Sequence, residues 1–304
     1  MRAVASAAPR DGAPRVAVSG VSLSKVRTVT LLLLPASFLI GLLTVCSIAV
    51  LRMSFGQKNA EWSEWTLDSY IALTDPYFVD ILVDTLWLAL LSAFITAVIS
   101  FPIALFMART RSEAARRLVL ICIMLPMLVS LLVQSFGWVA ILGPDGLANQ
   151  IVGAVLGVER PLSLLFNRTG VLLGLIQTTV PLAVLPMVAS LKSISPSLEE
   201  AASVLGASRV RVYTNVILPL SWPGIAAGLV LVFGFNTGAF VVPLLLGGLK
   251  VTTLALVIRD QMGVLLNWPM GSALSVVLIA FALSVQALQN TIGRRVSARR
   301  QDHG

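Results

Sequence analysis

The sequence predicts an all-α membrane protein with six transmembrane helices, and three observations lead to this prediction. First, 57% of the 304 residues are hydrophobic and only 12% are charged, whereas soluble domains carry about a quarter charged residues. Second, six apolar stretches have the length that crosses a hydrocarbon core about 30 Å thick. These stretches lie at approximately 29–51, 84–108, 118–142, 170–191, 219–245 and 271–293. Third, lysine and arginine are concentrated near the ends of these stretches.

The positions of the basic residues predict that both termini lie in the cytoplasm. With the N-terminus inside, 16 of the 22 lysine and arginine residues fall on the cytoplasmic side, and nine of the 14 acidic residues fall outside. This is the asymmetry that the positive-inside rule describes. The net charge of +8 therefore reflects membrane topology and does not indicate a nucleic-acid-binding protein.

The two ends of the chain are predicted to be cytoplasmic tails. Residues 1–28 are rich in Ala, Val, Ser, Pro and Gly and carry five basic residues, which indicates a disordered tail. The apolar stretch that follows is too long for a signal peptide and has no A-x-A cleavage site, so we expect an uncleaved anchor. The membrane domain is expected at 29–293, and a basic tail at 294–304.

The segments on the outer side are predicted to hold short interfacial helices. Residues 52–83 are rich in aromatic side chains, residues 143–168 begin with the turn sequence G-P-D-G, and residues 247–270 begin with a Gly-Gly pair. Aromatic residues favour the membrane–water interface.

Several apolar stretches contain proline, which either kinks helices that move or is simply tolerated there. Both explanations stay open from the sequence.

The polar stretch 196–219 predicts a helix, a glycine elbow and a second helix at the cytoplasmic surface. Pro196 suits the first position of a helix, where its missing N–H costs nothing. Ser197 and Glu200 have the S-x-x-E spacing of a capping box. Gly206 is the expected stop, because glycine tolerates a positive φ. The helical pattern resumes two residues later.

The sequence offers no catalytic machinery. It lacks the G-x-x-x-x-G-K-[ST] phosphate loop, the H-E-x-x-H zinc motif and the G-x-S-x-G nucleophile elbow. The single histidine, His303, stands at the C-terminus, and Cys46 and Cys122 lie inside apolar stretches. We therefore expect a non-enzymatic chain with no cofactor and no metal, whose energy comes from a partner.

Polar and aromatic residues at membrane depth are candidates for a solute pathway, because polar groups there are costly unless they face protein or a cavity. The candidates are Phe235, Asn236, Thr237 and Phe240 in the fifth stretch, Gln134 and Trp138 in the third, and Gln177 in the fourth. The aromatic rings could hold a cation. The alternative for Asn236 is a hydrogen bond between helices, and the alternative for Gly234 and Gly238 is small-residue packing. Both alternatives remain open.

The stretch from Glu200 to Pro219 resembles the EAA loop of ABC-importer permease subunits. In that family E-A-A is followed after three residues by G, and after nine more by I-x-L-P. Here Val216 replaces the isoleucine, and the other positions match. The resemblance implies a type I ABC importer permease fold in which the loop 192–219 holds a cytoplasmic coupling helix that docks on an ATPase. The residues to which it assigns this coupling are Glu199, Glu200, Ala201, Ala202, Gly206, Leu218 and Pro219.

Three further segments resemble the spermidine/putrescine branch of these permeases. They are G-A-F-V-V-P-L-L-L-G-G at 238–248, N-W-P-M-G-S-A at 267–273 and F-G-W at 136–138. The resemblance covers about residues 30–293 and implies the translocation subunit of an ATP-driven polyamine importer in a bacterial inner membrane. The implied partners are two ATPase subunits that bind ATP and Mg²⁺, a second homologous permease in a heterodimer, and an extracytoplasmic solute-binding protein.

Other functions remain open at this point. Relatives that carry opines, phosphonates, iron or thiamine share such segments, so the solute could be one of these. An ion-driven secondary transporter would need titratable groups at membrane depth, and the six stretches have almost none away from their ends. A structural scaffold would leave the loop 196–219 without a role.

Overall fold

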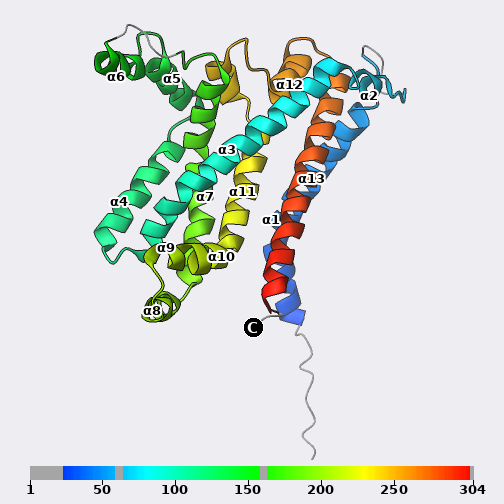
Figure 1. Ribbon diagram of the computed structural model, residues 1–304. Helices are drawn as coiled ribbons and strands as arrows, with labels where there is room; N and C mark the ends of the chain where they lie inside the picture. The colour runs from blue at the N-terminus through cyan, green and yellow to red at the C-terminus, as the bar shows by residue number, and fades with distance from the viewer. Residues whose placement is uncertain (1–22, 59–63, 158–162, 302–304) are drawn as a thin grey trace, which may run out of the picture. The chain divides into compact units, whose positions relative to one another are not determined.

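The computed structural model describes residues 23–58, 64–157 and 163–301, and the regular secondary structure in these ranges is all helical (Figure 1). The predicted all-α class is therefore confirmed. The chain divides into two compact units, Met1–Ala49 and Val50–Gly304. Five helical segments of the described ranges are long and apolar enough to cross a membrane, and the number is six if one bent pair is counted as a single span. This agrees in number with the six predicted spans.

The first unit contains most of helix α1 (Leu23–Met53). Its segment Leu34–Met53 is long and apolar enough to cross a membrane. The helix runs from Leu23 to Met53 and includes Pro35. Residues 23–28 are therefore helical, which corrects the C-terminal end of the predicted disordered tail. The rest of that tail, 1–22, lies outside the described residues.

Three long helices of the second unit match predicted stretches. They are α3 (Pro76–Arg109), α7 (Arg168–Ser193) and α13 (Trp268–Gln301). Side chains cap the first two helices: the Asp75 carboxylate accepts a hydrogen bond from Tyr77 N, and the Asn167 side chain accepts one from Gly170 N, both at 2.9 Å. Helix α13 extends into the predicted basic tail 294–304 as far as Gln301.

The third predicted stretch, 118–142, is wrong as a single helix. It contains the end of α4 (Glu113–Met124), the 3-10 helix η1 (Leu125–Leu128) and α5 (Leu131–Leu142). Pro126 at this break cannot donate a backbone hydrogen bond. The side chain of Gln134 donates to the Pro126 carbonyl and, at 2.8 Å, to the Val129 carbonyl. A polar side chain thus satisfies the backbone groups that the break exposes.

The fifth predicted stretch, 219–245, contains a shorter straight helix than expected. Its main helix is α11 (Trp222–Thr237), which the π-helix η2 (Tyr213–Ile217) and the single turn α10 (Leu218–Leu220) precede and the π-helix η3 (Pro243–Gly247) follows. The segments Arg209–Leu220 and Trp222–Thr237 meet at an angle of 63°. Pro219, Pro223 and Pro243 each occupy one of the first two positions of a segment, where proline is tolerated.

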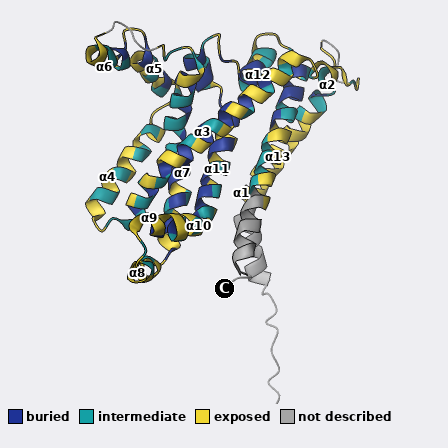
Figure 2. Ribbon diagram, in the orientation of Figure 1, coloured by how far each residue is buried: buried dark blue, intermediate teal, exposed yellow. Residues whose placement is uncertain are grey.

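Helices α3, α7 and α11 form the core of the second unit, and their facing sides are buried (Figure 2). Gly224 and Gly228 of α11 lie against α7: a Cβ at Gly224 would stand 2.4 Å from Ser190 Cβ, and one at Gly228 would stand 3.2 Å from a backbone oxygen of α7. Small residues at this spacing let helices approach closely. Gly234 and Gly238, the pair considered from the sequence, do not pack this way, because a Cβ at Gly234 meets nothing within 4 Å.

Polar contacts join the core helices. Asn236 Nδ2 on α11 donates a hydrogen bond to Ser92 Oγ on α3 at 2.8 Å, and both residues are buried. The hydroxyls of Thr96 on α3 and Thr179 on α7 lie 3.4 Å apart. The interhelical hydrogen bond that was one alternative for Asn236 is therefore present.

Short helices occupy the two opposite ends of the second unit (Figure 1). At one end lie α2 (Asp68–Ala72), α6 (Leu147–Leu156) and α12 (Leu254–Gly263). These fall in the outer segments where short helices were predicted. At the other end lie α8 (Pro196–Val204), α9 (Arg209–Val212) and α10, together with the C-termini of α3 and α7. The cytoplasmic assignment of this second end stays a prediction from the basic residues.

Candidate functional site

Helix α8 begins at Pro196, as predicted, but its cap is a different residue. The Ser195 hydroxyl accepts a hydrogen bond from Ser197 N at 3.4 Å, so Ser195 is the N-cap and Pro196 is the first helical residue. The predicted capping box of Ser197 and Glu200 is therefore wrong. With Pro196 in the first position, Ser197 is the second helical residue and Glu200 the fifth, beyond the reach of a cap.

Gly206 ends α8 in the left-handed conformation that the sequence predicts, with φ of +80°. Two backbone hydrogen bonds close the turn: Ala207 N donates to the Ala202 carbonyl at 3.1 Å, and Gly206 N donates to the Ser203 carbonyl at 3.0 Å. This pair of bonds is the Schellman motif. The motif fixes the distance from the alanine to the glycine, which gives the A-A-x-x-x-G spacing a physical cause.

The chain resumes as a helix directly after the elbow, as predicted. The Ser208 hydroxyl accepts a hydrogen bond from Arg211 N at 3.4 Å and caps α9. Helices α9 and α10, with η2 between them, then lead to the start of α11. Leu218 and Pro219 lie in α10, where Leu218 is exposed and Pro219 is half-buried.

The elbow has one anchored side and one free apolar side. Ala202 and Ala207 pack against the core cluster of α3, α7 and α11. In contrast, Val204 and Leu205 are each 87% exposed and Val210 is 71% exposed. We call these three residues the apolar tip. Such protruding apolar side chains are typical of a surface that a partner covers.

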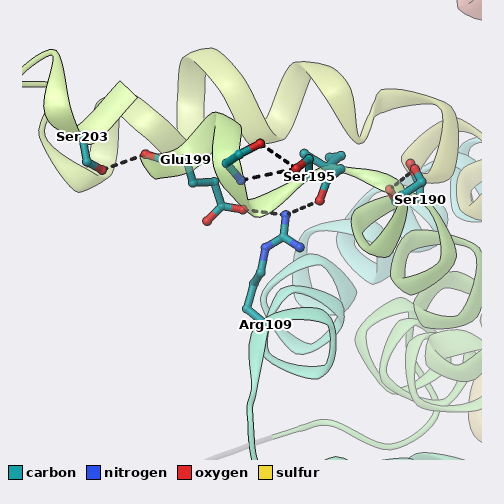
Figure 3. A network of polar contacts seen from close by, with 8 residues as sticks. Arg109, Ser190, Ser195, Glu199 and Ser203 are labelled. Carbon is teal, nitrogen blue, oxygen red and sulfur yellow. Dashed lines mark hydrogen bonds and ion pairs between the residues drawn. The ribbon is translucent and has the colours of Figure 1, made fainter. Parts of the chain in front are cut away.

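The charged residues of α8 differ in their surroundings. Glu199 Oε1 lies 2.5 Å from Arg109 Nη2, and the same Arg109 nitrogen donates to the Ile194 carbonyl at 3.3 Å (Figure 3). Glu200 and Ala201 are exposed, and no hydrogen bond or ion pair joins the Glu200 carboxylate to another residue that the structure describes. Glu199 is thus engaged within the chain, whereas Glu200 is free to meet a partner. Arg109 is not among the site residues predicted from the sequence.

The candidates of the fifth stretch fall on two sides of α11 and the segment after it. Asn236 and Thr237 are buried in the core, where the Thr237 hydroxyl donates to the Phe233 carbonyl at 2.7 Å. Phe235 and Phe240 are 45% and 43% exposed. The structure does not gather these four side chains into one pocket. Only the two phenylalanines are accessible from outside the second unit.

The candidates of the third and fourth stretches include one pair in direct contact. Trp138 Nε1 on α5 donates a hydrogen bond to Gln177 Oε1 on α7 at 3.1 Å. Gln134 instead donates hydrogen bonds to the carbonyls of Pro126 and Val129 at the helix break. Trp138 and Gln177 lie 39 positions apart and come from different helices, so their contact could not be predicted from the sequence.

Replacing Asn236 with leucine is expected to lower the stability of the helix core by about 0.6 kcal/mol, and by no more than about 1.7 kcal/mol, the range for single hydrogen bonds between membrane helices. The Ser92 hydroxyl keeps its own acceptor, the Ala89 carbonyl, at 3.0 Å. The measurement is thermal unfolding in detergent. Phe235→Leu is the control on the exposed side of the same helix. Equal stability of the two variants would contradict a stabilising role for the Asn236 bond.

The fold and the elbow agree with one protein family. Residues 100–298 match the model of the binding-protein-dependent transport system inner membrane component. The chain belongs to this family. It is therefore a multi-pass inner-membrane protein and the permease subunit of an ABC importer, a transport component.

Two relatives have sequences similar to that of this chain. The chain is 32% identical to the spermidine/putrescine transport system permease protein PotB of Salmonella typhimurium, over 70% of this chain and 74% of that one. It is 30% identical to PotB of Haemophilus influenzae, over 85% of this chain and 92% of that one. These matches agree with the spermidine/putrescine-type segments noted in the sequence.

A solved structure supports the fold. The chain superposes with a TM-score of 0.75 on a bacterial ABC transporter involved in the import of the acidic polysaccharide alginate. The match covers 90% of this chain and 97% of that one, at 21% identity. The type I ABC importer permease fold expected from the EAA-like loop is thus confirmed.

Proposed function

We propose that this permease works with two ATPase subunits and that α8 and its elbow are the part on which an ATPase docks. The observation that carries the proposal is the apolar tip of Val204, Leu205 and Val210. It projects from an elbow whose other side is held by Ala202 and Ala207 against the core. A displacement of a partner bound to this surface can be transmitted to the core helices against which the elbow packs.

The energy for transport is proposed to come entirely from the ATPase partners. ATP and Mg²⁺ would bind there, and this chain would hold no cofactor. The tip supplies apolar contact area, and the exposed carboxylate of Glu200 supplies a charge for a basic group of the partner. Gly206 sets the angle between the two helices of the elbow. Together these residues suit a docking element without catalytic groups.

The other proposed partners are a second, homologous permease and an extracytoplasmic solute-binding protein. The family description names a binding-protein-dependent system. A heterodimer is favoured because chains of the spermidine/putrescine branch usually come in two kinds. The exposed Phe235 and Phe240 then lie where a second permease or the solute pathway would meet α11 and the segment after it.

The proposed solute class is polyamines. Support comes from the two relatives, both spermidine/putrescine permeases by name, which share 30–32% identity with this chain over 70–85% of its length. Aromatic side chains such as Phe235 and Phe240 interact favourably with ammonium groups. The solute class is tested directly by measuring the uptake of labelled spermidine in the presence of putrescine as a competitor, or of sulfate as an unrelated anion.

The docking proposal predicts that Glu200→Lys weakens or abolishes ATPase association. The test is affinity purification of the tagged full chain in mild detergent, followed by mass spectrometry of the proteins that accompany it. We expect an ATPase and a second permease with the wild type, and a reduced ATPase with Glu200→Lys, because a reversed charge repels a basic partner group.

Asp80→Lys is the matched control, because Asp80 is also an exposed carboxylate but belongs to the other end of α3. It should retain the ATPase. A wild-type chain that purifies without any ATPase, while folded, would contradict the docking proposal. Equal loss of the ATPase in both variants would show that the effect is not specific to α8.

A further inference from the structure

Arg109 connects three helices at the end of the second unit that carries α8. It is the last residue of α3. Its Nη2 atom lies 2.5 Å from Glu199 Oε1 in α8 and donates to the carbonyl of Ile194, the C-cap of α7, at 3.3 Å (Figure 3). One guanidinium group therefore joins the ends of α3 and α7 to the docking helix.

The surroundings of this ion pair set it apart from the other ion pairs among the described residues. The side chains of Arg109 and Glu199 are only 21% and 23% exposed. In contrast, Glu113 in its pair with Arg116 is 64% exposed. Partial burial strengthens an ion pair because the surrounding dielectric is lower and salt screens it less. The Arg109 contact is thus better suited to transmit force than an exposed pair.

The local chemistry also favours each contact. Ile194 follows the last turn of α7, where carbonyl groups lack helical partners and carry partial negative charge. Glu199 stands near the start of α8, where the helix dipole favours a carboxylate. Arginine has a planar fork of donors that can serve two acceptors at once, which lysine has not. The three groups therefore match one another in charge and in geometry.

Apart from its contacts with the neighbouring α9 and η2, helix α8 has few other attachments. Its contact with the core is made by the small side chain of Ala202, and Ala207 adds a second small contact just beyond the elbow. Leu198, Val204 and Leu205 are exposed. Two alanine methyl groups bury little apolar area, so their contribution to holding the nine-residue helix is small. A further connection to the membrane helices would make a movement of α8 act on them more directly.

We propose that Arg109 is a positioning residue for energy coupling: it locks α8 to the ends of α3 and α7, so that a displacement of α8 carries the core helices with it. The inference rests on the proposed function in one respect, that α8 is the docking element. It adds a named route from that element into the helix core. Helix α3 packs along both α7 and α11, so it is suited to spread the movement.

The test measures how much solute crosses the membrane for each ATP hydrolysed. The complete transporter, with its ATPase and binding protein, is reconstituted in vesicles with labelled spermidine as the probe. Arg109→Ala and Glu199→Ala are each expected to lower this ratio roughly two- to thirty-fold, the range that 0.5–2 kcal/mol of coupling energy produces. Arg109→Lys should restore part of the ratio, because it keeps the charge and loses the fork.

Arg116→Ala is the matched control, because it removes an arginine of the exposed pair on α4 near the same end. It should leave the ratio unchanged. A ratio that also stays unchanged in Arg109→Ala overturns the proposal. Loss of the ATPase from Arg109→Ala, where the wild type retains it, also overturns it, since the contact then serves docking and not transmission.

Hydrogen exchange of the full chain gives a readout that does not depend on the partners. Arg109→Ala should speed the exchange of the α8 amides at 198–204, while the amides of α11 keep their protection. Unchanged exchange of α8 overturns the positioning role. If the wild type binds no ATPase, the proposed function fails, and the exchange result still decides whether Arg109 holds α8.

Discussion

Replacing Gly206 with valine is expected to abolish ATP-driven solute uptake while the protein still inserts in the membrane. Gly206 has φ of +80°, a conformation that costs an L-residue roughly 1–2 kcal/mol, and β-branched valine fits it worst. A Cβ there would meet nothing within 4 Å, so the effect is conformational and not a clash. The angle of the elbow changes, and ATP hydrolysis is then no longer coupled to transport. Uptake and ATPase activity are measured side by side in the reconstituted transporter.

Two further substitutions at this position separate the conformational effect from other causes. Gly206→Asn should retain most of the uptake, because asparagine visits the left-handed region more readily than other residues. Gly206→Ala should fall between asparagine and valine. Normal uptake by Gly206→Val would contradict a role of the Gly206 conformation in coupling. Equal loss of uptake in all three variants would show that the φ angle is not the cause.

Replacing Gly224 with valine is expected to prevent normal folding of the helix core. A Cβ at Gly224 would lie 2.4 Å from Ser190 Cβ and 2.8 Å from the Pro186 carbonyl oxygen. The second of these atoms belongs to the backbone and cannot turn aside. Overpacking a core typically costs 1–3 kcal/mol, and we expect about the upper end of that range here. The measurement is the yield of monodisperse protein after extraction, together with its unfolding temperature.

Gly234→Val is the matched control for this experiment. It is the same change in the same helix, so differences in helix propensity cancel, but a Cβ at Gly234 meets nothing within 4 Å. This variant should be extracted in near-normal yield. Similar losses in Gly224→Val and Gly234→Val would mean that valine itself, and not the close approach to α7, destabilises the helix.

Features that depend on local sequence were predictable. Apart from the third and fifth, the apolar stretches predicted the membrane spans, because about 20 apolar residues in a row have few alternatives to a membrane helix. The elbow at Gly206 was predicted because a Schellman turn needs glycine at a fixed distance from the helix end. The cap was misplaced by two residues, since Ser195 and Ser197 both precede a plausible helix start and only Pro196 distinguishes them.

Features that depend on contacts between distant segments were not predictable from one sequence. The pair of Arg109 and Glu199 joins residues 90 positions apart, and nothing in either neighbourhood names the other. The choice between Gly224 with Gly228 and Gly234 with Gly238 depends on which face of α11 meets α7. Both pairs have the same spacing, so the sequence could not rank them.

The apolar tip also has a consequence for the protein before it binds its partners. Val204 and Leu205, each 87% exposed, present to the surrounding water the kind of apolar surface that chaperones and quality-control proteases bind. In the proposed assembly the docked ATPase covers this surface, and a copy of the permease without its ATPase leaves it open to such binding.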